Sequence, residues 1–550
     1  MKLNLRFVQT GYKVIKILIS SIKLHPLFPC RFIAILVLLT EIPVLAHSQQ
    51  RVQVVEADSA VVVTVNGKPV QKIWGHVHLK AEEMEMFADR AVKYSAEDLI
   101  EAFGNIQINT DQEIIWADTL TYYTDLDFAE LRSRVIIKSD SSTLFGNAVD
   151  YRFTNKVAHF LDRFQLVDSS GVLAADRGFY FRRPDSAAFR GHVQLQDSSN
   201  YAEGKYLFSN RKREYYELHE KVFAFDKENN TKLSGDYLES DSTGRSVVTG
   251  NAWLINYESN ADSTASPDSL KPLRVDSSNV TPDSTQLMQS GHMNLFQPDS
   301  LFAPPDTAKN DSTSQPDTTH IKARRIVSTQ NRKPADTTTT IRAYENVRIW
   351  SPDFAAVSDS ARYESKEDVF ELWEEAKIWY NQIQLSSPYI WIQLAEGDVK
   401  KLIAYPDPFV VRRDSVIDRL NQIKGDSLAA FFEDGTLKRM EVYPNSHILR
   451  FTKKEAKPDG AIELTAPETI IYFDKGDLTE VKSLADGELV NGYYRPEDVL
   501  TPNKQLDGFL WNPDLRPQKP KKPMERRLPP IPDKPPFELP PRYLEYISKP

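Results

Sequence analysis

The stretch "EAFGNIQINTDQEIIWADTLTYY", residues 101–123, contains two short segments in which apolar and polar residues alternate. Alternation with a period of two is typical of β-strands that bury one face. The polar run 109–111 stands between the two segments and favours a turn. The stretch therefore predicts a β-hairpin, whose Gly104-Asn105 pair is either a site or one copy of a repeated unit.

The position of Gly104 recurs along the chain at a nearly fixed spacing. Five steps of 29 residues and one of 30 connect the equivalent positions Gly75, Gly104, Ser133, Asp162, Gly191, Glu220 and Gly250. After residue 340 the pattern resumes at Glu345 and Glu374, again 29 residues apart. A fixed period of roughly 20–50 residues indicates a repeat architecture. Glycine, serine or aspartate at the recurrent position predicts a bulge or bend in each strand, and argues against a single reactive site.

An apolar-x-apolar pair follows each recurrent position, and its two members share one face of the strand. Aspartate or asparagine recurs in the other strand of each unit, at Asp89, Asp118, Asn147 and Asp176. No helix fits beside two ten-residue strands in one unit. Stacked hairpins then form a long sheet that must fold over on itself or pack on a second sheet. The predicted fold class is all-β, built of stacked antiparallel hairpins with a 29-residue repeat.

Composition divides the 550 residues into five parts. A basic N-terminus, the apolar run 32–39 and small residues at Ala46 and Ser48 predict an export signal, with an uncleaved anchor as the alternative. A segment rich in Asp, Ser, Thr and Pro lacks hydrophobic periodicity and predicts disorder. The expected boundaries are a signal peptide over 1–48, a first β-repeat domain over 49–258, a disordered linker over 259–340, a second, shorter β-repeat domain over 341–495 and a proline-rich tail over 496–550.

Charge and cysteine content exclude several classes of function. A net charge of −9 argues against non-specific nucleic-acid binding, which requires basic surfaces. The single cysteine, Cys30, precedes the apolar run, so signal cleavage removes it and leaves no thiol for disulfides, metal binding or catalysis. The tail carries a basic cluster and favours extended polyproline II conformation. It is interpreted as a flexible tail without a partner or as a docking segment for another envelope component.

The segments "MFADRAVKY", "FGNIQI", "IWADTLTYY", "FRGHVQL" and "VTGNAWLI" together resemble the LptA/OstA family, the organic-solvent-tolerance N-terminal-like domains that carry lipopolysaccharide across the periplasm. The resemblance covers about 50–258 well and 341–492 less securely. It implies a folded-over β-jellyroll, open along one side, with an apolar lumen that shields acyl chains. The duplicated domain, the long linker and the proline-rich tail depart from a minimal periplasmic bridge.

The expected function is that of a periplasmic lipid-binding β-groove protein in lipopolysaccharide transport and outer-membrane assembly, possessing no enzymatic activity and no cofactor or metal. Its expected partners are lipopolysaccharide or lipid A acyl chains and other transport components, the latter joined through edge strands such as Val61-Val62-Val63. Its expected location is the periplasm, with association with the outer membrane. The expected lipid-binding residues are Val77, Leu79, Ile106, Ile108, Val135, Ile137, Phe164, Leu166, Val193 and Leu195. The same residues could instead fill a closed β core.

Two other functions are weighed against lipid transport. One is a structural or adhesive envelope repeat protein, and the other is a glycan-active β-helix enzyme. The enzyme requires one local group of carboxylates, whereas the recurrent aspartates occur once per unit and fit a capping or turn role. His76 and His78 share a strand face in the manner of a metal pair, but the sequence offers no third ligand nearby.

Overall fold

The computed structural model describes residues 52–257 and 318–538, apart from short gaps at 82–83, 170, 184, 228–229, 332–337, 353, 381, 396–397, 434–435, 475–476, 485–489, 500–503, 523 and 533. The expected signal peptide lies outside the described residues, as does most of the expected linker. Within the described part, no helix is long and apolar enough to cross a membrane.

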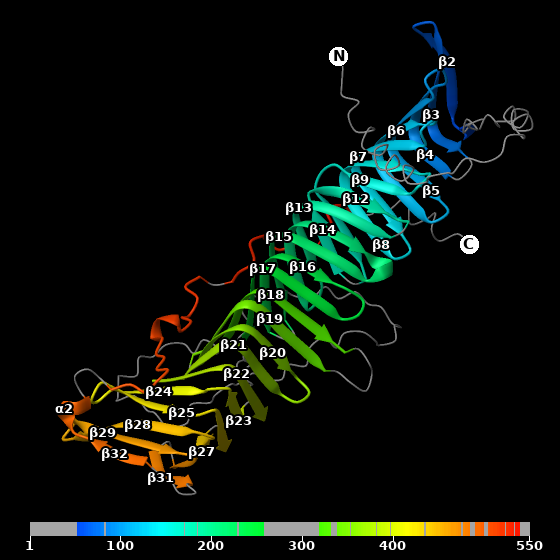
Figure 1. Ribbon diagram of the computed structural model, residues 1–550. Coiled ribbons are helices and arrows are strands. Elements are labelled where there is room, and N and C mark those ends of the chain that lie inside the picture. The colour runs from blue at the N-terminus through cyan, green and yellow to red at the C-terminus, as the bar shows by residue number, and fades with distance from the viewer. Residues whose placement is uncertain are drawn as a thin grey trace, which may run out of the picture. The chain divides into compact units, whose positions relative to one another are not determined.

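Antiparallel strands dominate the described chain (Figure 1). Up to residue 257 they are β1 (Gln53–Glu56), β2 (Ser59–Val65), β3 (Lys68–Lys80), β4 (Met84–Tyr94), β5 (Leu99–Thr110), β6 (Glu113–Tyr123), β7 (Phe128–Ser139), β8 (Ser142–Arg152), β9 (Val157–Phe160), β10 (Phe164–Asp168), β11 (Gly171–Ala175), β12 (Arg177–Phe181), β13 (Ser186–Gln196), β14 (Asn200–Asn210), β15 (Tyr215–Asp226), β16 (Thr231–Ser240) and β17 (Arg245–Tyr257). One 3-10 turn, η1 (Arg211–Arg213), precedes β15.

The strands continue after residue 317 in the same antiparallel manner. They are β18 (Thr318–Gln330), β19 (Thr339–Trp350), β20 (Phe354–Glu364), β21 (Val369–Tyr380), β22 (Ile383–Ala395), β23 (Asp398–Tyr405), β24 (Phe409–Asp414), β25 (Arg419–Lys424), β26 (Ser427–Glu433), β27 (Thr436–Tyr443), β28 (Ser446–Lys454), β29 (Lys457–Ala466), β30 (Glu468–Asp474), β31 (Asp477–Leu484) and β32 (Val490–Tyr494). A short helix α2 (Pro496–Val499) and the 3-10 turn η2 (Pro513–Leu515) follow.

A bend in the middle of each long strand folds the sheet into two walls. In β5 the bend is Gly104-Asn105, where both residues have positive φ and the pairing register shifts between Phe103 and Ile106. The part of β5 before the bend belongs to what we call the first wall, and the part after it to the second wall. Neighbouring strands run in the opposite direction and bend opposite the same point, so each wall is itself a continuous antiparallel ladder.

The bend recurs where the sequence repeat predicts it. Pairs of positive-φ residues stand at 75–76, 104–105, 133–134, 191–192, 220–221, 250–251, 345–346 and 374–375. At Asp162 the chain instead breaks into the separate strands β9 and β10. Beyond β22 every strand belongs to one wall: β23, β26, β27, β30 and β31 pair in the first wall, and β24, β25, β28, β29 and β32 in the second. The sequence repeat therefore sets the positions of the bends. The last layers of the stack, which we call rungs, keep the two walls although their strands have no bends.

The two expected β-repeat segments are joined in one ladder. Strand β17 pairs with β18 from Arg245↔Thr329 to Tyr257↔Thr318, and β18 pairs in turn with β19. Residues 318–330 were expected in the disordered linker and instead form β18. Their alternation is short and flanked by Asp, Thr and Pro residues, so the composition of this segment predicts disorder. The strand forms because it pairs with the neighbouring β17. The sheet therefore continues across the site of the expected linker.

The proline-rich tail lies on the outer face of the second wall. Leu506 is buried beside Phe409 and Leu449, Met524 is buried beside Tyr201 and Phe223, and Phe537 packs on Trp116. Because the tail begins at the last rungs and reaches β6, it runs back along the stack (Figure 1). Proline lacks an N–H group and cannot extend a strand ladder, so the tail packs on the wall as an extended chain.

Candidate functional site: the interior of the folded sheet

The interior between the walls is the main apolar feature of the described chain. Nine of the ten expected lipid-binding residues are at most 7 % exposed and belong to one continuous core cluster: Val77, Leu79, Ile106, Ile108, Val135, Ile137, Phe164, Leu166 and Val193. The tenth, Leu195, is partly buried and packs against the same cluster. The structure therefore brings all ten together on the inner face of the second wall.

Strand register aligns these side chains in a row. Leu79 pairs with Met86, Met86 with Ile108, Ile108 with Ile115, Ile115 with Ile137, and Ile137 with Leu144. The row continues through Leu166, Leu173, Leu195, Ala202, Ala224, Leu233, Leu254, Ile321, Ile349, Ala356, Ile378 and Leu385 to Val410. Every member is apolar, so one uninterrupted hydrophobic row crosses the point where β17 meets β18.

A second regularity lies beside the bends. The first apolar residue after each of the first five repeat positions pairs with a small residue on the next strand: Val77 with Ala88, Ile106 with Ala117, Val135 with Gly146, Phe164 with Ala175, and Val193 with Gly204. A large side chain facing a small one fills the narrow space where the two walls meet without overpacking it.

The opposing first wall supplies the residues that sequence reasoning did not assign. Ile100, Leu131, Phe160 and Phe189 are buried in the same cluster, and all four lie shortly before a position of the sequence repeat. Their signal was present in the sequence as an apolar alternation that precedes each recurrent position. The side chains of the two walls fill the interior together, because residues such as Ile106 and Ile108 retain no exposed surface.

The recurrent aspartates hold the bends. The Asn105 Nδ2 donates to the Asp89 Oδ2 over 2.8 Å, His192 Nδ1 lies 2.7 Å from an Asp176 carboxylate oxygen, and Arg134 makes an ion pair with Asp118. Each aspartate thus engages the second, polar residue of the bend on a neighbouring strand. These carboxylates have a structural partner at every one of these rungs, in agreement with the predicted capping role.

The edge of the fold opposite the bends forms a seam, at which the hairpin turns of the two walls meet. The Lys156 Nζ of a first-wall turn donates to the Asp111 Oδ1 of a second-wall turn over 2.7 Å. Two rungs further along, Arg211 lies 3.1 Å from Asp168 across the same seam. The hydrogen bond from Lys156 lowers the pKa of Asp111 below its usual value. The seam is therefore closed by ion pairs rather than by backbone pairing.

One ion pair of the seam is buried. Arg182 of the first wall contacts Glu113 of the second wall, whose side chain is 4 % exposed. The Tyr151 hydroxyl donates to the same carboxylate. Burial, followed by the charge of Glu113, raises the pKa of Tyr151 above its usual value. Tyrosines donate in a similar way to turn aspartates on other rungs, as Tyr180 does to Asp185, and burial raises the pKa of Tyr180 to about 12.

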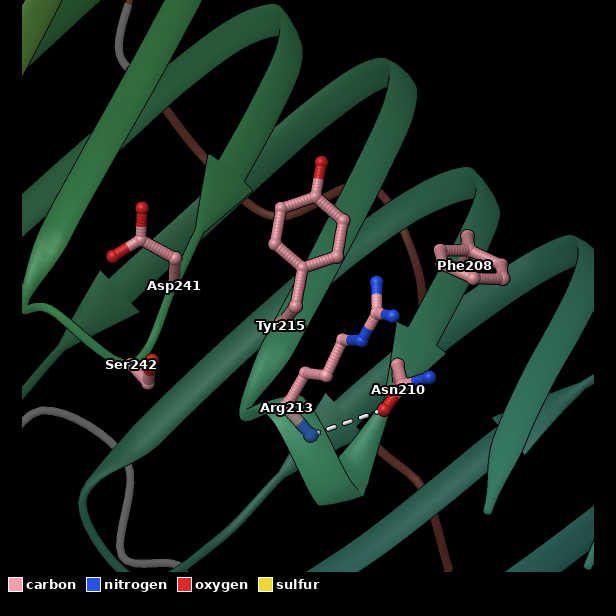
Figure 2. Close-up of a pocket in the computed structure, with 6 residues that line it drawn as sticks. All are labelled: Phe208, Asn210, Arg213, Tyr215, Asp241 and Ser242. Atoms are coloured by element: carbon pink, nitrogen blue, oxygen red, sulfur yellow. Dashed lines mark hydrogen bonds between the residues drawn. The ribbon is translucent and has the colours of Figure 1, made fainter. Parts of the chain in front are cut away.

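A shallow pocket lies on the turns of the first wall, lined by Phe208, Asn210, Arg213, Tyr215, Asp241 and Ser242 (Figure 2). Its polar groups serve the turns themselves. The Asn210 side chain accepts from the Arg213 backbone N–H over 3.0 Å, and the Asp241 carboxylate accepts from the Thr243 backbone N–H over 2.9 Å. Among the described residues no group of three His, Cys, Asp or Glu side chains is placed to hold a metal ion.

Residues 49–202 match the family described as OstA-like protein. We call this part of the chain the OstA-like domain, after the family that it matches. No curated protein matches the chain. Among solved structures, the chain is similar to LptH of Pseudomonas aeruginosa, described as the LptA-homologous periplasmic component of the lipopolysaccharide transport device. The identity is 14 %, the match covers 20 % of this chain and 80 % of LptH, and the TM-score is 0.18.

The OstA-like domain ends within β14, but the two-walled ladder does not. Strand β14 pairs with β15 over the full length of both strands, with the same register shift at the bend. The apolar interior row also passes through Ala202 into Ala224 without a break. The rungs after the OstA-like domain therefore extend the same architecture.

Proposed function

We propose that this chain is an exported, periplasmic β-groove protein that binds lipid and takes part in lipopolysaccharide transport and outer-membrane assembly. The observation that carries the proposal is the single apolar row that runs from Leu79 to Val410 between the two walls. The OstA-like domain supports the same assignment. An acyl chain held along such a row leaves water at about 0.8 kcal/mol for each CH₂ buried. Sugars and phosphates of the lipid remain outside in solvent.

Lipid enters through the seam in this proposal. The interior side chains fill the space between the walls, so an acyl chain requires the walls to separate. The bends are held by backbone connections and aspartate contacts, whereas the seam is held by side-chain ion pairs such as Lys156–Asp111. Surface ion pairs contribute at most about 1 kcal/mol each, and loss of one partner of the buried Arg182–Glu113 pair costs on the order of 3 kcal/mol. Separation at the seam therefore costs less than separation at the bends.

Photocrosslinking tests lipid binding. A photoreactive amino acid at Ile106 or Phe164, in cells that make lipopolysaccharide, is expected to capture lipopolysaccharide on irradiation. The matched control is the same amino acid at Glu101, which precedes the bend of β5 and is only partly buried. Lipid adducts at the two interior positions but not at Glu101 support the proposal. If no interior position yields a lipid adduct, the lipid-binding function is wrong.

The filled interior favours a second candidate, a structural or adhesive envelope repeat protein. A core in which Ile106, Ile108 and Val193 have no exposed surface is what such a protein requires. The two candidates differ in the cell. Depletion of a transport component lowers lipopolysaccharide at the cell surface, whereas depletion of a structural repeat protein leaves it unchanged.

Partner components would join through the first strands. Strand β2 pairs only with β3 among the described strands, and its Val62 side chain is 64 % exposed. An edge strand offers unpaired backbone groups to a strand of another protein. Val62→Lys is expected to reduce site-specific crosslinking of β2 to other transport components, because a charge at an edge opposes strand addition. Val416→Lys, at a comparably exposed turn residue, should leave it unchanged; equal crosslinking in both variants would exclude β2 as the contact.

A further inference from the structure

The outer face of the second wall holds polar side chains that are buried by the tail. Gln384 and Gln194 are 0 % exposed, Gln422 is 1 % exposed and Glu203 is 2 % exposed. Side chains on the outside of a folded-over sheet normally face solvent, and buried polar groups require hydrogen-bonding partners. The tail supplies such partners to all four residues.

Two glutamines bind the tail backbone with the same geometry. The Gln422 Nε2 donates to the Lys504 carbonyl over 3.4 Å, and its Oε1 accepts from the Leu506 N–H over 2.8 Å. The Gln384 Nε2 donates to the Leu510 carbonyl over 2.9 Å, and its Oε1 accepts from the Asn512 N–H over 2.8 Å. In each case one amide side chain holds the carbonyl of one tail residue and the N–H of the residue two positions later. The two glutamines therefore bind main-chain groups of the tail, which requires the tail to be extended.

The third contact uses a carboxylate. Glu203 accepts from the backbone N–H groups of Arg527 and Leu528 over 2.7 and 3.0 Å, and from the Tyr201 hydroxyl over 2.7 Å. The neighbouring Gln194 donates to the Pro529 carbonyl over 2.6 Å. Because a buried carboxylate needs several donors, the tail N–H groups that precede the prolines are the groups that satisfy Glu203.

Apolar side chains of the tail fill pockets between these contacts. Phe509 packs edge-on against Phe409, with 6.1 Å between ring centroids, and Met524 lies in the cluster of Tyr201, Phe223 and Ile255. Phe537 packs on Trp116 and Ile136. Proline restricts the free chain to extended conformations, so less entropy is lost when it is ordered along the wall.

We propose that the outer face of the second wall is a recognition track for an extended, proline-rich peptide, and that the tail of the same chain is its ligand. Recognition rests on side-chain amides and a carboxylate that bind main-chain groups, with aromatic and aliphatic anchors between them. The tail does not add a strand to the sheet. The track is thus a peptide-binding site distinct from the interior, on the opposite face of the second wall.

The test cuts the covalent connection between the ladder and the tail in the folded protein. A protease recognition sequence is inserted between Val499 and Lys504, and the folded protein is cleaved. The cut tail is expected to co-elute with the ladder, and a fluorescent synthetic peptide of residues 504–538 should displace it with saturable 1:1 binding. Gln384→Ala combined with Gln422→Ala should weaken the peptide by at least about tenfold, since four hydrogen bonds are lost. Gln393→Ala, on the first-wall half of β22, should not.

Two further experiments do not rely on the correct folding of any single protein variant. Phe509 and Trp511 both pack against the cluster that contains Phe409 and Leu449. A peptide with Phe509→Ala and Trp511→Ala should therefore bind at least about tenfold more weakly to the unaltered ladder. In the uncut chain, Gln384→Ala should accelerate hydrogen exchange at the Asn512 amide and leave the Leu528 amide unchanged. Release of the tail on cleavage from a ladder with an unchanged circular dichroism spectrum, together with no peptide binding, overturns the proposal. Unchanged exchange at Asn512 overturns it as well.

Discussion

At the scale of single residues, Gly104 shows why glycine suits a bend at which an aspartate side chain lies close to the backbone. Its φ is +77°, and a Cβ at this position would lie 2.5 Å from the Asp89 Oδ2. Gly67 has nearly the same φ, +79°, but a Cβ there would meet no other atom within 4 Å. The left-handed conformation costs an L-residue about 1–2 kcal/mol at either position. Only Gly104 adds a steric conflict with the aspartate that holds the bend.

Gly104→Ala is therefore expected to lower the thermal unfolding midpoint more than Gly67→Ala does. The backbone penalty is common to both variants, so the difference between them measures the collision with Asp89. Thermal unfolding followed by circular dichroism checks the order of the two midpoints. Equal losses would mean that the bend accommodates a methyl group and that the Asp89 contact places no demand on residue 104.

The buried ion pair of the seam gives a second prediction for single residues. Arg182→Ala leaves the Glu113 carboxylate buried with the Tyr151 hydroxyl as its remaining side-chain donor. Loss of one partner of a buried pair costs on the order of 3 kcal/mol. Hydrogen exchange in β6 should accelerate accordingly, and Glu113→Gln in the same background should restore part of the protection. The control is the adjacent and exposed Arg183. Arg183→Ala should change hydrogen exchange in β6 only slightly. Equal effects of the two substitutions would contradict the role of Arg182 as the partner of a buried carboxylate.

At the scale of elements, the seam and the bends differ in what holds them. The seam joins turns of opposite walls through pairs such as Lys156–Asp111, while Lys68–Glu97, 2.9 Å apart, joins two positions within the first wall. Crosslinking the first pair prevents the walls from separating, and crosslinking the second does not. Asp111, Lys68 and Glu97 are exposed and Lys156 is partly exposed, so the same crosslinking chemistry can be applied to each pair.

Cysteines at 111 and 156, in a background with Cys30→Ser, are expected to abolish lipid loading once joined by a cleavable bis-maleimide. Loading should return when the linker is cleaved, because the seam can then open. Cysteines at 68 and 97, joined in the same way, should leave loading intact. Loading that is unaffected by the 111–156 crosslink would show that lipid uses another entrance, while lipid binding in the interior would stand.

The elements also show what the sequence could predict. The bends followed from the spacing of Gly75, Gly104 and Gly191, and the inner face of the second wall from the alternation after each bend. The tail track could not be predicted in the same way, because Gln384 and Gln422 are polar residues at positions without a period. Proline-rich sequence also lacks alternation, so only the structure pairs it with a wall hundreds of residues earlier in the chain.

At the scale of the whole molecule, the tail lies along the outer face of one continuous ladder. The stability of distant parts of the chain is therefore coupled. In a stack of rungs each rung contacts its neighbours, so stability is close to a sum of local terms. Strand β17 is joined to β18 by backbone pairs from Arg245 to Tyr257. The tail adds a connection that skips many rungs, because residues 524–529 of the last part bind Tyr201 and Glu203 of the first.

A chain cleaved between Tyr257 and Thr318 is therefore expected to remain one particle. The fragments before and after the cut share the β17–β18 pairing, the continuous interior row and the tail contacts with Glu203. Size-exclusion chromatography with light scattering should give the mass of both fragments together. Glu203→Ala removes the acceptor of two tail N–H groups, and the nicked variant should dissociate at a lower denaturant concentration than the nicked parent. Separate elution of the fragments without denaturant would show instead that the two parts fold as independent domains, because neither the strand pairing nor the tail would then hold them together.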